Sequence, residues 1–229
     1  RTAGIFQSKQ DIDSWIAAGN GVMQANVQPG DVKYVDINRD GMIDAKDKTD
    51  LGNGLPKYTF GFNIMLGWKG FDLGLNATGA AGFKIAQSYR NPNAAQANYS
   101  RSILDRWTGE GTSNKMPRVT YNDVGNWLFS DLYLQDGDYI RLQNLTLGYD
   151  FKRLIAWKGI SRLRLYLQAQ NLLTLTKYDG MDPEVGSYNG TDANHVNSDG
   201  STTQTWVSGV DMGYYPHPRT FIVGVNIAF

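Results

Sequence analysis

Residues 57–80, KYTFGFNIMLGWKGFDLGLNATGA, decide the fold class of this chain. From Tyr58 to Trp68, large apolar side chains occupy every second position, and small or polar residues fill most of the positions between them. The alternation resumes at Phe71 and continues to about Ala80. A period of two places successive side chains on opposite faces of a strand. Because only Lys69-Gly70 separates the two runs, the stretch predicts two antiparallel strands joined by a tight hairpin.

Three further segments carry the same periodicity. The sharpest is Ser161–Leu172, where leucines alternate with arginine, tyrosine and glutamine, and Arg219–Phe229 alternates as cleanly. In Asp138–Phe151 the apolar residues change parity partway along, which a β-bulge near Gln143 or Asn144 would reconcile. The sequence therefore predicts an all-β chain with five antiparallel strands.

Strand length and loop length favour a transmembrane barrel over a soluble sheet. The segments are about ten residues long, which matches the 9–11 residues that a tilted strand needs to cross a bilayer. Short connections alternate with very long ones, roughly 81–137 and 173–218, as periplasmic turns alternate with extracellular loops in outer-membrane barrels. Aromatic residues stand at strand ends, as in an interfacial girdle: Tyr58, Trp68, Phe71, Tyr149, Phe221 and Phe229. A soluble antiparallel sheet with one solvated face is the alternative.

Five strands are too few to close a barrel, because about eight is the smallest common closed number. The remaining strands must come from residues outside this sequence or from another chain. If the C-terminus is periplasmic, the long loops and the segment up to Pro56 lie outside the cell. Leu165 is then expected to face lipid and Arg164 the lumen. Other lumen-facing polar residues are ordinary wall positions, so the substrate-binding residues stay unknown: Asp72, Asn76, Arg162, Gln168 and Gln170.

Composition excludes several classes of protein. The formal net charge is zero, which gives no indication of a nucleic-acid or anionic-membrane partner. The absence of cysteine excludes a disulfide framework and thiol chemistry. No run reaches the roughly 18 apolar residues of a membrane helix, and the polar start RTAGIFQSKQ is no signal peptide. We therefore expect a chain that is cut at its front and complete at its aromatic C-terminus.

The strongest local motif is DINRDGMIDAKD, residues 36–47. Oxygen-bearing side chains stand at loop positions 1, 3, 5, 9 and 12, with glycine at position 6, which is the spacing of an EF-hand calcium loop. The last position carries an aspartate instead of the usual bidentate glutamate, and helical flanks are not evident. The expected calcium ligands are Asp36, Asn38, Asp40, the Met42 carbonyl, Asp44 and Asp47. The alternative is an Asx-rich turn without metal.

Catalytic constellations are weak, so we predict no enzyme and no catalytic residues. His195 and His217 lie in polar loops without a metal-binding spacing, and the acids Asp182, Glu184 and Asp211 are interpreted as solvated loop residues. Aromatic residues crowd the expected outer loops and could stack on a ligand. Packing within the loops, or against a partner, is the preferred interpretation for most of them: Tyr89, Tyr99, Trp107, Tyr121, Trp127, Tyr188, Trp206, Tyr214 and Tyr215.

Four stretches together resemble the C-terminal barrel portion of SusC/RagA-type TonB-dependent transporters. They are PGDVKYVDINRDGMIDAKDKTDLGNGLPKYTFGFN (29–63), LQDGDYIRLQNLTLGYDF (134–151), LRLYLQAQNLLTLTKYDGMDPEV (163–185) and GYYPHPRTFIVGVNIAF (213–229). They follow in the family's order, and the span over which they recur, from about Gly30 to Phe229, includes most of the chain. The combination is far more specific than the calcium motif alone.

The resemblance implies an outer-membrane importer with about 22 strands, a plug domain and a TonB box. It also implies a SusD-like lipoprotein lid and a substrate that is an oligosaccharide or a peptide. Residues 1–56 are then an extracellular segment with the calcium loop, and residues 57–229 are the last barrel strands, without plug or TonB box. A passive porin or receptor barrel and a soluble secreted calcium- and carbohydrate-binding β module are the alternatives.

Overall fold

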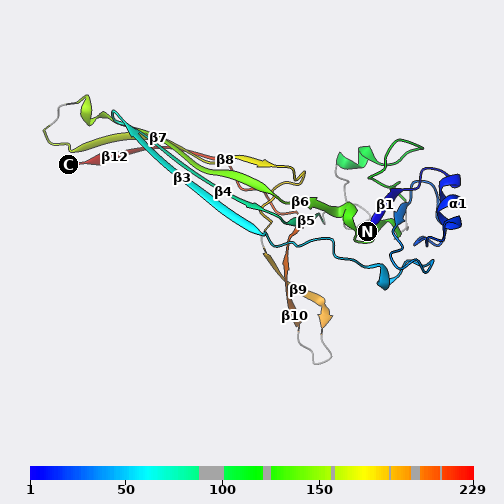
Figure 1. Ribbon diagram of the computed structural model, residues 1–229. Coiled ribbons are helices and arrows are strands. Elements are labelled where there is room, and N and C mark those ends of the chain that lie inside the picture. Colours follow the sequence, from blue (N-terminus) through cyan, green and yellow to red (C-terminus); the bar gives the residue numbers. More distant parts are fainter. Residues whose placement is uncertain (88–100, 121–124, 156–157, 186, 197–201, 212) are drawn as a thin grey trace. The chain divides into compact units, whose positions relative to one another are not determined.

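The computed structural model describes residues 1–87, 101–120, 125–155, 158–185, 187–196, 202–211 and 213–229 (Figure 1). The chain divides into two compact units. The first comprises Arg1–Gly52 and Ser88–Leu134, and the second comprises Asn53–Gln87 and Gln135–Phe229. Each unit has its own strands and its own buried residues. Among the described residues, no helix is long and apolar enough to cross a membrane.

A five-stranded antiparallel sheet dominates the second unit. Its strands lie in the order β12-β8-β7-β4-β3, and every neighbouring pair is antiparallel. The long strands run side by side in Figure 1. All five predicted strands are therefore confirmed, with the bounds β3 (Tyr58–Trp68), β4 (Phe71–Ala81), β7 (Tyr139–Asp150), β8 (Arg162–Thr176) and β12 (Thr220–Ala228).

The hairpin and the bulge also agree with the sequence. Lys69 and Gly70 have φ angles of 47° and 94°, the left-handed pair that a two-residue turn between twisted strands requires. In β7, Asn144 pairs with Asn76 while Leu142 pairs with Ala77, so Gln143 is the extra residue of a bulge. The bulge moves the apolar residues on either side of Gln143 onto one face of the sheet.

One face of this sheet is apolar across all five strands. The register sets Leu66, Leu73, Leu147, Leu167 and Val223 in one row across the sheet, strand by strand. Val223 is 70% exposed and Leu167 is 55% exposed. The other exposed side chains of this apolar face include Tyr58, Phe62, Ile64, Trp68, Phe71, Leu165, Leu173, Leu175, Phe221, Val225 and Ile227.

Smaller elements lie at the loop end of the sheet. The strands β5 (Lys84–Gln87), β6 (Leu134–Asp136) and β11 (Val210–Asp211) form a three-stranded sheet, in which β11 runs parallel to β5. A separate hairpin pairs β9 (Ser187–Val196) with β10 (Thr202–Ser208). At the other end of the sheet, beside the hairpin turn, a short 3₁₀ helix, η5 (Phe151–Arg153), follows β7. The small core of this unit is Ala80, Phe83, Ile85 and Tyr178, with Tyr139 and Val185 against it.

The first unit is a small mixed domain with a water-excluding core. Its elements are β1 (Thr2–Ile5), α1 (Lys9–Ala17), β2 (Val32–Tyr34) and the 3₁₀ helices η1 (Ala45–Asp47), η2 (Arg101–Asp105), η3 (Gly125–Trp127) and η4 (Asp131–Tyr133). Ser8 caps α1, because its side chain accepts a hydrogen bond from the Asp11 backbone N–H. The core consists of Ile5, Phe6, Ile12, Val32 and Tyr34.

The first of the two compact units is not made of the N-terminal segment alone. Residues 101–134, which the sequence assigns to a long loop, group with the N-terminal segment. Hydrogen bonds between distant residues explain this grouping: the backbone N–H of Thr2 donates to Asp131, and that of Ile5 donates to Asn114. The first unit is therefore built from two segments that are far apart in the sequence.

Candidate functional site

The polar face of the large sheet is held by an ion pair that spans three strands. The Nε of Arg164, on β8, donates to an Asp72 carboxylate oxygen, on β4, at 2.7 Å, and a second guanidinium nitrogen contacts the other oxygen. The pair passes over Gly148 of the intervening strand β7, where a Cβ would lie 2.5 Å from Arg164 and from Asp72. A side chain larger than hydrogen at position 148 would therefore force the bidentate pair apart.

Other polar side chains extend this arrangement along the same face. The guanidinium carbon of Arg164 lies 4.8 Å from the ring centroid of Tyr166, and the Tyr166 ring covers Gly224 of β12. The Gln168 amide donates to Asn144 at 3.1 Å. The charges of Arg164 and Asp72 are thus compensated within the sheet. Arg164 faces away from the apolar side, as the alternation predicts.

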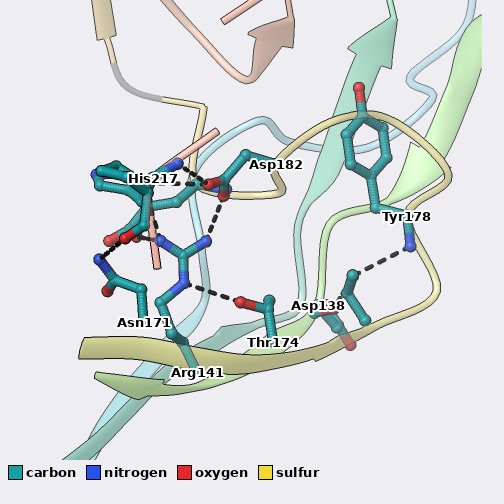
Figure 2. Close-up of polar contacts among 10 residues, drawn as sticks. Asp138, Arg141, Asn171, Thr174, Tyr178, Asp182 and His217 are labelled. Carbon is teal, nitrogen blue, oxygen red and sulfur yellow. Dashed lines mark hydrogen bonds and ion pairs between the residues drawn. The ribbon is translucent and has the colours of Figure 1, made fainter. Parts of the chain in front are cut away.

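A second site lies where the sheet meets its loops, around Arg141 (Figure 2). This guanidinium is almost fully buried. Its Nε donates to the Thr174 hydroxyl at 3.1 Å, one terminal nitrogen lies 2.8 Å from Glu184, and the other contacts Asp182. His217 Nδ1 is 2.9 Å from Arg141 and 3.1 Å from Asp182. We call Arg141, Asp182, Glu184 and His217 the loop anchor.

The loop anchor connects two loops that are distant in sequence to the N-terminal end of β7. Asp182 and Glu184 lie in the loop after β8, and His217 lies in the segment before β12. Burial opposes the charge on Asp182, but hydrogen bonds from the Glu184 and His217 backbone N–H groups, with the Arg141 guanidinium, keep the pKa of its carboxyl below the usual range. The Asp182 carboxylate is therefore ionised and paired with Arg141.

The interpretation of three acids as solvated loop residues is wrong for Asp182 and Asp211, whereas Glu184 is exposed although it pairs with Arg141. Asp182 and Asp211 are both buried, and Asp211 accepts the Tyr178 hydroxyl at 2.6 Å. Among the described residues, Asp182, Glu184 and His217 are the group of three metal-capable side chains whose ligand atoms lie within 4.8 Å of one another. Because Arg141 already occupies their centre with a positive charge, this group is better suited to holding loops than to holding a metal.

The predicted calcium loop, residues 36–47, is closed by its own backbone amides. The N–H groups of Arg39 and Gly41 donate to Asp36, and those of Ile37 and Asp44 donate to Asp47 at 2.8 Å each. The hydrogen bonds from Asp44 and Ile37 hold the pKa of the Asp47 carboxyl below its usual range. The carboxylates at loop positions 1 and 12, Asp36 and Asp47, are thus both oriented by backbone N–H groups of the loop itself.

The remaining expected ligands of this loop are partly exposed. Asn38 and Asp40 hydrogen-bond each other, Asp40 also accepts the Met42 N–H, and Asp44 caps η1 by accepting the Lys46 N–H. The donor set is one that calcium accepts. Within the described residues, however, these carboxylates do not form a group of three whose oxygens lie within 4.8 Å of one another. Calcium binding therefore stays a prediction.

Sequence analysis missed the buried polar network of the first unit. Asp31 is fully buried, and it accepts from Arg118 Nε at 2.6 Å and from the Asn126 amide at 2.8 Å. Asn126 in turn accepts from the Val32 N–H and from Gln24. Arg118 and Asn126 lie 87 and 95 residues from Asp31 in the sequence, and no local pattern connects them. A buried network of this kind fixes one arrangement of the two segments.

Some of the expected loop aromatics can be placed. Trp107 packs inside the first unit, where its indole N–H donates to Gln7 at 3.2 Å, and Tyr214 is half-buried. Tyr215 is exposed. Tyr89, Tyr99 and Tyr121 lie outside the described residues, as do the side chains of Tyr188, His195 and Trp206. Packing within a loop is thus confirmed for Trp107.

Comparison with known proteins begins with curated sequences. No protein-family model matches the chain. It is 32% identical over 213 residues to the TonB-dependent receptor P3 of Formosa agariphila, a match that covers 92% of this chain and 20% of that protein. It is 26% identical over 212 residues to the TonB-dependent receptor SusC of Bacteroides thetaiotaomicron, covering 91% of this chain and 18% of that protein. The chain spans about a fifth of the length of the curated relatives it matches.

Solved structures give the same picture for the fold. The RagAB peptide importer in its closed-closed state superposes with a TM-score of 0.63 at 22% identity, covering 100% of this chain and 22% of that one. Another structure, of the RagAB peptide transporter, gives 0.61 at 24% identity over 91% of this chain. At these identities the likeness concerns the fold, and it extends over the whole described arrangement of strands.

Proposed function

This chain belongs to the SusC/RagA family of TonB-dependent receptors, and on that premise we propose that it forms wall strands and outer loops of an outer-membrane importer. The whole protein would be a barrel of about 22 strands around a plug, with TonB supplying the energy for import. It would act in transport and not in catalysis. Its relatives are named as receptors, and RagAB is named as an importer, which supports this choice.

One observation carries the proposal: an apolar face that five strands share and that is exposed. The strands are 9 to 15 residues long, enough to cross the hydrocarbon core. A soluble sandwich would cover such a face with a second layer, and among the described residues the apolar face remains exposed. The opposite face is polar and carries its own compensated charges. Lipid on one side and a polar lumen on the other account for both faces.

The open edges of the sheet support a larger barrel. The strands β3 and β12 end the strand order, so each has a neighbour on one side only among the described strands. An exposed edge of this length invites pairing with other chains. Strands from the remainder of the same barrel would satisfy both edges. We therefore expect residues 57–229 on their own to aggregate in the absence of detergent.

The loop end is the proposed side of substrate capture. The loop anchor fixes the loops after β8 and before β12, and the first unit adds a folded module formed partly from the chain between β5 and β6. Rigid loops of this kind suit the binding of a substrate and of a SusD-like lipoprotein lid outside the cell, with the C-terminus in the periplasm. RagAB is a peptide importer, which supports a peptide substrate, while an oligosaccharide is the other class proposed.

For the segment 36–47 we propose a calcium ion with a structural role. Asp36, Asn38, Asp40, Asp44, Asp47 and the Met42 carbonyl would hold it. The hydrogen bonds to Asp36 and Asp47 support the proposal, because they already orient the first and last carboxylates of the loop. The ion would stiffen an extracellular loop of the first unit.

The test of the importer proposal uses the full-length receptor in its native membrane. Carbonate extraction should leave the receptor in the outer-membrane fraction, and uptake of its substrate should stop when TonB is deleted. Mass spectrometry of ligands that co-purify with the receptor and its lipoprotein then separates peptides from oligosaccharides. A receptor released by carbonate, or an uptake that is independent of TonB, would contradict the proposal.

A further inference from the structure

The turn end of the large sheet has a charge distribution that the overall net charge of zero conceals. Two connections lie at this end: residues 69–70 and residues 151–161, FKRLIAWKGIS. The first contains one basic residue, the second contains three, and neither contains an acid. The backbone N–H of Asp150 donates to the Gly70 carbonyl at 2.8 Å, so the two connections are neighbours. These two connections thus contribute four basic residues and no acid at one end of the sheet.

The two acids nearest to this end do not pair with Lys69 or Lys158. Asp72 is engaged with Arg164 on the polar face. Asp150 accepts the Lys152 backbone N–H at 2.9 Å and lies 3.8 Å from Arg162. Within the part of the chain that the structure describes, neither Lys69 nor Lys158 has an ion-pair partner, and both are exposed. Their ammonium groups are available to an anion outside the sheet.

Aromatic rings form a row directly beside Lys69. The register sets Trp68, Phe71 and Tyr149 at one level on the apolar face. The Phe71 and Tyr149 ring centroids are 4.4 Å apart, and Phe151 stands 5.0 Å from Tyr149. Lys69 Nζ lies 4.9 Å from the Trp68 ring centroid, so this cation rests on the aromatic row. Rings with a cation beyond them match the depth profile of a bilayer interface, in which glycerol and then phosphate follow the hydrocarbon.

The left-handed backbone conformation of Lys69 further indicates that its positive charge has a function. Its φ of 47° lies in the left-handed region, where a two-residue turn favours asparagine, aspartate or glycine. A lysine there is less favourable than asparagine, and residues kept in such conformations are often functional. Trp-Lys-Gly occurs in both connections, at 68–70 and again at 157–159, although the placement of Trp157 lies outside the described residues.

We propose that this turn rim, defined as Trp68, Lys69, Phe71, Tyr149, Phe151 and Lys158, binds the phosphate-bearing headgroups of anionic phospholipids. The aromatic row occupies the glycerol level of the leaflet, and the two lysines reach its phosphates. The inference rests on the proposed function, because it requires the apolar face to contact lipid. Beyond that function, the inference names the class of lipid that one end of the sheet binds. It also assigns this end to the periplasmic leaflet, which contains phospholipid.

The test compares lipid selectivity among variants of the full-length receptor in mixed phosphatidylglycerol and phosphatidylcholine bilayers with identical acyl chains. Native mass spectrometry after release from the bilayer measures the ratio of the two lipids retained. Wild type should prefer phosphatidylglycerol. Lys69→Asn and Lys158→Gln should each lower that preference about fivefold, which corresponds to about 1 kcal/mol per cation near an anionic surface. Lys69→Asn keeps a residue that suits the turn, so a loss of preference does not reflect a broken hairpin.

The matched control removes two cations from the opposite end of the same sheet. Lys57 precedes β3 and Lys177 follows β8, and both are exposed. The Lys57→Gln, Lys177→Gln variant should keep the wild-type preference within about twofold, although it loses the same charge. A full preference in the Lys69→Asn, Lys158→Gln variant would overturn the inference, as would an equal loss in the control. A bilayer-inserted wild type without preference overturns this inference alone, and a receptor that never inserts overturns the proposed function with it.

Discussion

The two units of this chain place their apolar side chains in opposite positions, buried in the first unit and exposed on the sheet of the second. In the first unit, Ile5, Phe6 and Val32 are inside and almost completely shielded. In the large sheet of the second unit, side chains of the same kind stand on an exposed face, and the polar face carries the internal ion pair of Arg164. The same hydrophobic effect produces both patterns if the two units have different solvents. The comparison therefore supports the proposal that water surrounds the first unit and that lipid covers the apolar face of the sheet.

The largest expected effect concerns two phenylalanines, one from each unit. Phe6 is 1% exposed and Phe221 is 73% exposed. Phe6→Ala should cost about 3–5 kcal/mol, because it removes buried area and leaves a cavity that the domain cannot refill. Phe221→Ala should cost under about 3 kcal/mol, because lipid chains fill the space and only the transfer contribution is lost. Denaturant-dependent hydrogen exchange of each unit in the full-length protein measures both, and equal costs would break the comparison.

The next effect compares adjacent residues on the central strand β7. Leu147 lies on the apolar face and Thr146 on the polar face, where it is paired with Gln168. Leu147→Arg should destabilise the folded barrel by roughly 2–4 kcal/mol, because the charge must enter hydrocarbon. Thr146→Arg should cost less than about 1 kcal/mol on the same scale. Urea unfolding in lipid vesicles supplies the numbers, and a larger cost at Thr146 would mean that the two faces are interchanged.

The loop anchor offers a pH-dependent test at the boundary between the sheet and its loops. Because the pKa of Asp182 is lowered in the folded protein, its stabilising contribution is complete above the unfolded value of 3.8 and is lost as the pH falls through the lower folded value. Exchange rates in residues 177–185, corrected for their intrinsic pH dependence, should rise below about pH 4. Asp182→Asn should weaken the anchor by about 1–3 kcal/mol at neutral pH. That variant should also show a flatter pH response, and an unchanged response would contradict the assignment.

The smallest effect concerns the acidic loop of the first unit. Asp40→Ala should abolish calcium binding measured by titration calorimetry and raise hydrogen exchange in residues 36–47, while the stability of the sheet changes by less than about 0.5 kcal/mol. Asp50→Ala is the matched control, because Asp50 lies just beyond the loop and the Gly52 backbone N–H donates a local hydrogen bond to it. Identical calcium titrations for wild type and Asp40→Ala would reduce the motif to an Asx-rich turn.

The strands of the sheet could be predicted because their signal is local. A period of two over ten residues needs no knowledge of a partner strand, and the parity change in β7 revealed the bulge at Gln143. The same reasoning ended the fourth strand at Leu172, four residues before its end at Thr176. The reason is Asn171, whose φ of 50° accompanies a second irregularity in register and shifts the parity of Leu173 and Leu175. In the sequence alone, a change of parity within a strand cannot be distinguished from the end of the strand.

The first unit and the loop anchor could not be predicted, because their signals are not local. The strands β1 and β2 contain four and three residues, too few to show a period. Their stability depends on Asn126 and Asn114, which lie about a hundred residues away. Asp182 was interpreted as a solvated acid because its partner Arg141 lies 41 residues earlier, on strand β7. The burial of a charged residue can be recognised only when the position of its partner in the fold is known.

A nitroxide spin-label scan along β7, in the membrane, tests most directly whether the apolar face of the sheet contacts lipid and its polar face contacts water. The sequence contains no cysteine, so a single cysteine introduced at each of residues 144–147 gives a unique label within this chain. Labels at Leu145 and Leu147 should be accessible to oxygen dissolved in lipid and protected from a water-soluble nickel chelate. Labels at Asn144 and Thr146 should show the reverse. An accessibility that does not alternate, with the chelate reaching Leu145 and Leu147 as readily as Thr146, would contradict a lipid-facing sheet.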